Sequence, residues 1–85
     1  MLAESPSRAA VAARARAEVP FEVPIPMRVQ VPSHLRRQPN AKAAVVGIIA
    51  AESPVVAVAY RGIWVRIETE DARSGWIHRT LVALR

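Results

Sequence analysis

Two short stretches decide the fold of this 85-residue sequence: 62-GIWVRI-67 and 75-GWIH-78. Successive side chains of a β-strand point to opposite faces, so the first stretch places Ile63, Val65 and Ile67 together on one face. Such β-branched side chains are typical of strands that pack on a core. We therefore predict that this face is the inside of a sheet.

The second stretch continues the same pattern. Gly75 and Ile77 share its core face, and the glycine is expected where the backbone of another strand comes close. Strand-length runs rich in β-branched or aromatic residues cover Ala44–Ala50, Val55–Tyr60, Ile63–Thr69 and Ser74–His78. Turn-forming residues separate these runs, at 38–40, 52–54, 61–62 and 70–73. With no cysteine and room for one domain only, we predict an all-β, small five-stranded antiparallel barrel.

The C-terminal part of the chain, about residues 33–84, resembles the bacterial SH3 (Src-homology 3) domain family. The resemblance lies in the opening Leu35-Arg36-Arg37-Gln38-Pro39 segment, the Val-rich run before the first tryptophan hairpin, the Gly62–Ile67 and Gly75–His78 stretches, and Leu81. It implies an SH3-like barrel that binds ligands and is not an enzyme, and it implies that peptidoglycan is one candidate ligand. The sequence departs from the family at Gln38, at Ser53-Pro54 and in the Asp71 turn, where the family often has glycine.

Residues 1–32 have no counterpart in that resemblance, and we predict that they form an N-terminal arm before a barrel of residues 33–85. Its first part is rich in Ala and Arg, and Ser7 could cap a short helix from Arg8 to Glu18. Its second part has four prolines, which favour an extended, partly polyproline-II chain. Four large apolar side chains along it are predicted to pack on the barrel or on a partner: Phe21, Val23, Ile25 and Met27.

The formal net charge is +5, and residues 33–85 carry eight of the twelve Lys and Arg residues. This balance favours anionic partners, or simply solubility. No stretch has the roughly 20 apolar residues that cross a bilayer, and no signal peptide is visible. We expect the chain to be cytoplasmic or peripheral to a larger complex.

Residues for catalysis are scarce. His34 and His78 are the only histidines, and neither belongs to a recognisable catalytic set. The acidic turn at Glu68, Glu70 and Asp71 is interpreted as a solvated turn and not as a cation site, which needs about six oxygen ligands. We predict no catalytic residues, no metal site and no cofactor.

A binding surface is predicted on the strand face opposite the core. It combines Tyr60, Trp64, Arg66, Trp76 and His78. Aromatic rings beside a guanidinium can stack on a peptide, a sugar or a base. In the competing interpretation the tryptophans cover the core and Arg66 is solvated.

Three functions follow from these observations. The leading hypothesis is a non-catalytic interaction or structural subunit that docks into a larger protein assembly through its barrel and its N-terminal arm. The alternatives are a peptidoglycan-binding module of the cell envelope and a basic nucleic-acid-binding barrel. The last would use Arg36, Arg37, Lys42, Arg61, Arg66 and Arg79, and its affinity would fall steeply with salt.

Overall fold

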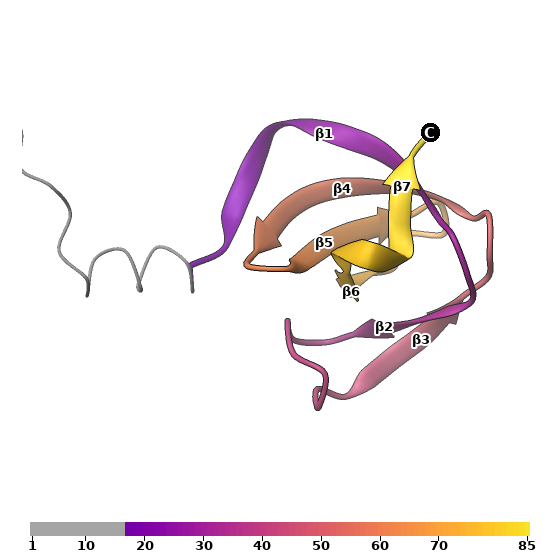
Figure 1. The fold of residues 1–85 in the computed structure, drawn as a ribbon, viewed down its shortest axis with the longest axis horizontal. Coiled ribbons are helices and arrows are strands. Elements are labelled where there is room, and N and C mark those ends of the chain that lie inside the picture. Colours follow the sequence, from indigo (N-terminus) through magenta and orange to yellow (C-terminus); the bar gives the residue numbers. More distant parts are fainter. Residues whose placement is uncertain (1–16) are drawn as a thin grey trace, which may run out of the picture.

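The computed structural model describes residues 17–85, and these form an all-β fold (Figure 1). The elements are β1 (Val19–Val29), β2 (Ser33–Arg36), β3 (Val45–Ile49), β4 (Pro54–Arg61), β5 (Trp64–Thr69), β6 (Ser74–His78), the 3-10 turn η1 (Arg79–Leu81) and β7 (Val82–Leu84). The predicted all-β class is confirmed, but the sheet has seven strands and not five. Short strands such as β2 and β7 give little periodic signal in a sequence, and β1 adds another strand.

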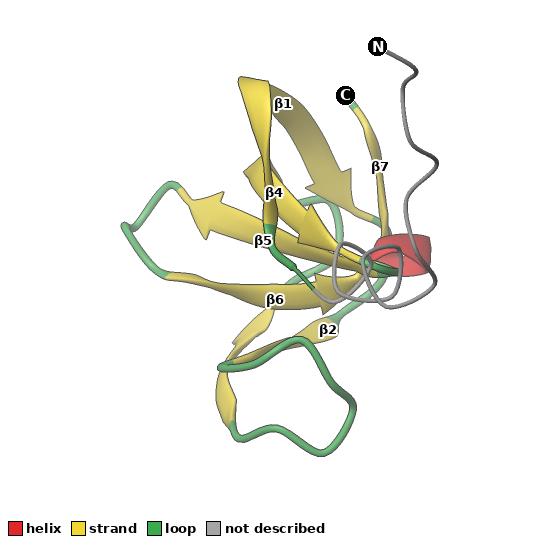
Figure 2. Cartoon of the chain, turned by 90° about the vertical axis from the view of Figure 1, so that its left-hand side faces the viewer, coloured by secondary structure: helices red, strands yellow, loops and turns green. Residues whose placement is uncertain are grey.

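All seven strands belong to one antiparallel sheet, in the order β3-β2-β6-β5-β4-β1-β7. The sheet curls, so that β1 arches over one side and the β2–β3 hairpin lies below (Figure 1). A quarter turn of the molecule shows β4, β5 and β6 fanned between these two ends (Figure 2). No helix in the described part of the chain is long and apolar enough to cross a membrane.

Strand β1 is made of the Pro-rich segment, which is extended as predicted. Its second half pairs with β4 on one side and with β7 on the other. Pairing with β4 is interrupted between Pro20, opposite Ala59, and Ile25, opposite Ala57. Proline has no amide hydrogen to donate to a ladder, so a strand with prolines at 20, 24 and 26 can leave its neighbour here. The predicted helix from Arg8 to Glu18 falls almost entirely on residues 1–16, outside the described residues.

Every strand contributes at least one side chain to a single core. Its buried members are Val29, Leu35, Ile49, Val55, Ala57, Val65, Ile67, Ile77 and Val82. The predicted inward positions of Val65, Ile67 and Ile77 are therefore confirmed. The expectation for Ile63 was wrong, since this side chain is 50% exposed.

The turn between β4 and β5 explains the error at Ile63. Arg61 pairs with Trp64, so Gly62 and Ile63 are the two loop residues of a tight hairpin. Gly62 has φ +58, which glycine adopts without strain. Because Ile63 lies in the loop, the strand's alternation begins only at Trp64.

Gly75 marks the predicted close approach of two strands. A Cβ atom there would lie 2.7 Å from Leu35 Cγ and 2.8 Å from the carbonyl oxygen of Arg36. The backbone oxygen belongs to β2, which pairs with β6 only at Arg36 and Trp76. A side chain at position 75 would therefore push β2 off the sheet.

We predict that Gly75→Ala lowers the free energy of unfolding by about 2–3 kcal/mol, in the upper part of the range for overpacking. Gly47→Ala is the matched control, because a Cβ there would meet only the guanidinium end of Arg73, at 2.7 Å. That end can move aside, so the control should change stability by less than about 0.5 kcal/mol. Urea unfolding of both variants measures the difference, and equal losses would contradict the proposed close approach.

Candidate binding surface

The outer face of β5 and β6 carries four of the five side chains predicted as a binding surface. Cross-strand partners in an antiparallel pair point to the same face. Trp64 pairs with His78, and Arg66 pairs with Trp76, which places these four side chains together. The rings of Trp64 and His78 meet edge to face, with centroids 5.5 Å apart and planes at 75°.

Trp76 is the most enclosed member of this face, since only 6% of it is exposed. It lies opposite Arg66 on one side and Arg36 on the other. Arg66 in turn forms an ion pair with Glu18, at 3.0 Å, and its Nε is buried without a hydrogen-bond partner in the described residues. Much of this surface is therefore already covered by the protein's own side chains.

Tyr60 does not join the tryptophans, contrary to the expectation that the aromatic residues sit together. It pairs with Val65, whose side chain points into the core, so Tyr60 lies on the opposite face from Trp64. Its ring contacts that of Phe21, with centroids 5.3 Å apart. The register shift in β4 between Ala57 and Ala59 changes which residues face outward, and simple alternation cannot anticipate it.

The apolar side chains of the Pro-rich segment are mostly used within the molecule. Phe21, Ile25 and Met27 are partly buried and pack against the core. Val23 is 75% exposed. It lies in the part of β1 where pairing with β4 is interrupted. Of these four residues, Val23 offers the most surface to a partner.

His78 has a structural role at the start of η1. Its Nδ1 accepts a hydrogen bond from the Thr80 backbone N–H, at 3.3 Å, and lies 2.7 Å from the Thr80 hydroxyl oxygen. The ring thus caps this turn. Within residues 17–85, no three His, Cys, Asp or Glu side chains are grouped to hold a metal ion.

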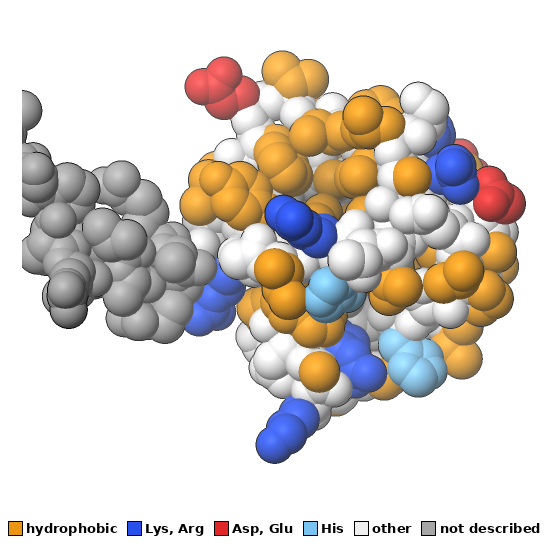
Figure 3. Space-filling model, in the orientation of Figure 1, with side chains coloured by type: hydrophobic (Ala, Val, Ile, Leu, Met, Phe, Trp, Pro, Cys, Tyr) orange, Lys and Arg blue, Asp and Glu red, His pale blue; other side chains and the backbone are white. Residues whose placement is uncertain are grey.

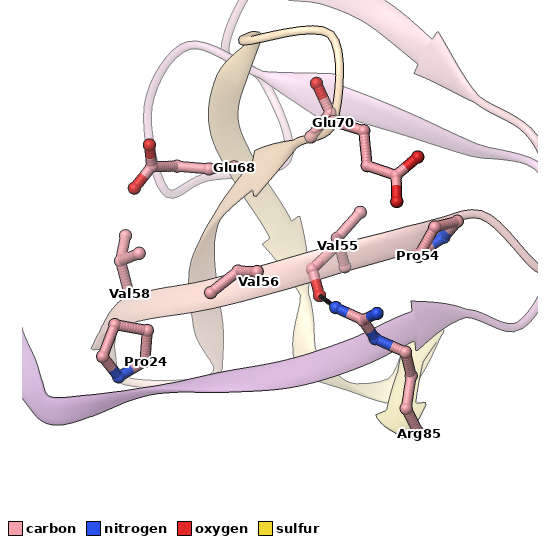
Figure 4. Close-up of a pocket in the computed structure, with 9 residues that line it drawn as sticks. Pro24, Pro54, Val55, Val56, Val58, Glu68, Glu70 and Arg85 are labelled. Carbon is pink, nitrogen blue, oxygen red and sulfur yellow. Dashed lines mark hydrogen bonds between the residues drawn. The ribbon is translucent and has the colours of Figure 1, made fainter.

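A groove that sequence reasoning did not identify lies across β1, β4 and β5. It has a volume of about 230 Å³. Val56 and Val58 of β4 lie between Pro24 of β1 on one side and Glu68 of β5 on the other (Figure 4). The complete lining is Pro24, Pro54, Val55, Val56, Val58, Glu68, Thr69, Glu70 and Arg85.

Two irregularities in pairing build this groove. Strand β1 leaves β4 between Pro20 and Ile25, which is where Pro24 lies. Strand β4 has its own register shift between Ala57 and Ala59, at Val58. Val56 pairs directly with Glu68, so the valine and the carboxylate share the outer face. The groove is therefore apolar along β4 and acidic along β5.

A second hollow, also of about 230 Å³, adjoins the first at Pro54, Thr69 and Glu70. Its far side is formed by the turn at Asp71 and Arg73. The Thr69 hydroxyl donates to the Asp71 carboxylate, and Arg73 Nε donates to it at 3.0 Å. These hydrogen bonds, that of Thr69 first, lower the pKa of Asp71 below its usual value. Asp71 is thus ionised but already satisfied.

Surface chemistry differs along the molecule. In the space-filling view, hydrophobic side chains gather in the upper part, where β1 runs, and basic side chains are scattered over the whole visible face (Figures 1 and 3). The other exposed apolar side chains include Val45, Val46 and Ile48 on β3, at one edge of the sheet.

Comparison with known proteins agrees with this architecture. Residues 33–83 match the sequence profile of the bacterial SH3 domain. The chain belongs to this family, whose domains are binding modules. No curated protein and no solved structure matched the chain. Strand β1, with Pro24, and Arg85 lie outside the matched residues, so the groove combines family and non-family parts.

The two tryptophans should differ in their effect on stability. Trp76→Ala is expected to lower the free energy of unfolding by about 3–5 kcal/mol, the range for buried aromatic residues. Trp64→Ala should lower it by clearly less, because Trp64 is only half-buried. Chemical denaturation of the two variants checks this order. A nearly neutral Trp76→Ala would instead identify Trp76 as an exposed, ligand-facing side chain.

Proposed function

We propose that this protein is a non-catalytic interaction module that binds an extended segment of a protein partner in the groove between β1 and β5. The observation that carries the proposal is the groove itself, whose apolar floor the described chain leaves uncovered. Membership in a family of binding modules supports it. The module would act as a docking subunit within a larger assembly.

Construction of the groove favours a polypeptide ligand. Its floor is a strand, and its wall at Pro24 is an extended segment that has left that strand. An extended chain lying between them would bury apolar side chains on Val56 and Val58, and burial of apolar surface stabilises association. The hollow that adjoins at Pro54 and Glu70 lengthens the available track.

The leading hypothesis changes in one respect. Because Phe21, Ile25 and Met27 pack against the protein's own core, we assign β1 to the module and not to the N-terminal arm. The contribution of β1 to binding is then indirect: it supplies one side of the groove. Peptidoglycan remains the alternative ligand that the family suggests.

The test is co-purification of the full chain from its native source, compared between Val58→Asp and the control Ile48→Asp. Neither aspartate is placed in the buried core, since Val58 is half-buried in the floor of the groove and Ile48 is 63% exposed. A specific protein partner should be retained by the wild type and by Ile48→Asp and lost by Val58→Asp, with unchanged urea midpoints.

Sedimentation with purified cell wall is the second arm of this test. We expect the wild-type protein to remain in the supernatant. Co-sedimentation that Val58→Asp abolishes would replace the protein partner with peptidoglycan. A protein partner retained equally by all three chains would contradict the assignment of the groove.

A further inference from the structure

We infer that the segment bound in the groove is cationic: an extended apolar sequence carrying lysine or arginine whose charge is held by Glu68 or by Glu70, the carboxylates of which point to different parts of the groove (Figure 4). This inference rests on the proposed function and specifies its partner. It follows from which carboxylates of the described residues form ion pairs and which do not.

Three of the six acidic side chains in residues 17–85 form ion pairs with arginines. Glu18 pairs with Arg66 at 3.0 Å, Glu52 with Arg28 at 3.3 Å, and Asp71 with Arg73 at 3.0 Å. Neither groove glutamate takes part in an ion pair within residues 17–85. Both are exposed, and both border the groove beside its apolar floor.

Arg85 does not supply the missing charge. Its Nη2 donates to the backbone oxygen of Val55 at 3.1 Å, on the other side of β4 from Glu68 (Figure 4). A ligand lying along β4 would therefore meet valine side chains below and, beside them, two carboxylates that form no ion pair among residues 17–85. A ligand with an apolar side chain and, one or two residues away, an ammonium or guanidinium group can contact the valines and a carboxylate at the same time. Hydrogen bonds from a cation to a carboxylate are stronger than those between neutral groups.

The groove and the net charge of the whole protein favour peptides of opposite charge. With a net charge of +5, long-range attraction alone favours acidic peptides. The groove favours basic ones. A selection experiment therefore separates specific recognition from general electrostatics by the sign of the charge that is enriched.

The experiment is selection of random heptapeptides displayed on phage against the full immobilised chain, followed by affinity measurement for the enriched peptides. We expect enriched peptides to place Lys or Arg next to Val, Ile, Leu or Pro. Their affinity should fall by about three- to tenfold for Glu68→Gln/Glu70→Gln at low salt, and the difference should shrink as salt screens exposed charges.

Glu22→Gln is the control for net charge, and it removes one negative charge where the double variant removes two. Glu22 is exposed, is in no ion pair among the described residues and does not line the groove, so its removal changes the net charge without touching the site. Its affinity for the enriched peptides should stay within twofold of the wild type, roughly the scatter expected for surface changes.

Each other outcome has a defined meaning. Enriched apolar peptides that lack basic residues and bind the double variant equally would overturn the cation inference and leave the proposed function standing. Acidic peptides, or equal losses for Glu22→Gln, would overturn it in favour of general electrostatics. Failure to enrich any peptide that Val58→Asp rejects would overturn the proposed function as well.

Discussion

The pairing of β1 with both β4 and β7 is the constraint on which the rest of the structure depends. The second half of β1 pairs with β4 and with β7, and these two strands are separated in the chain by β5, β6 and η1. The pairing is reinforced where Glu52 and Val29 bond through their backbones, at 2.7 Å, and where Gln30 N–H donates to the Leu81 carbonyl, at 2.8 Å. Without β1, Val29 would leave the core and β4 would become an open edge.

The same strand links the fold to the function that we propose. Proline donates no amide hydrogen to a ladder, and the pairing of β1 with β4 is interrupted between Pro20 and Ile25, the stretch that contains Pro24. Where β1 is unpaired from β4, its Pro24 forms one side of the groove. The proposed binding groove is thus a consequence of the residues that keep β1 extended but only partly paired.

Sequence reasoning succeeded where one face of a strand is strictly buried. Val65, Ile67 and Ile77 could be assigned to the core from alternation, and Gly75 to a close approach, because burial leaves a period of two in the sequence. It failed where the register shifts. The side of Tyr60 and the groove at Val58 both depend on which β4 residue is unpaired, and that is decided by neighbouring strands and not by local sequence. The prolines of β1 were the only feature of the sequence that could have pointed to the groove.

Amide hydrogen exchange of the isolated full chain tests most directly whether β1 is a wall of the barrel. The Val29 N–H donates to the Ser53 carbonyl at 3.0 Å, inside the core-forming half of β1. It should therefore exchange as slowly as the protected amides of β5 and β6, in the absence of any partner. Rapid exchange at Val29 while β5 and β6 remain protected would contradict this account, because the sheet would then close without β1.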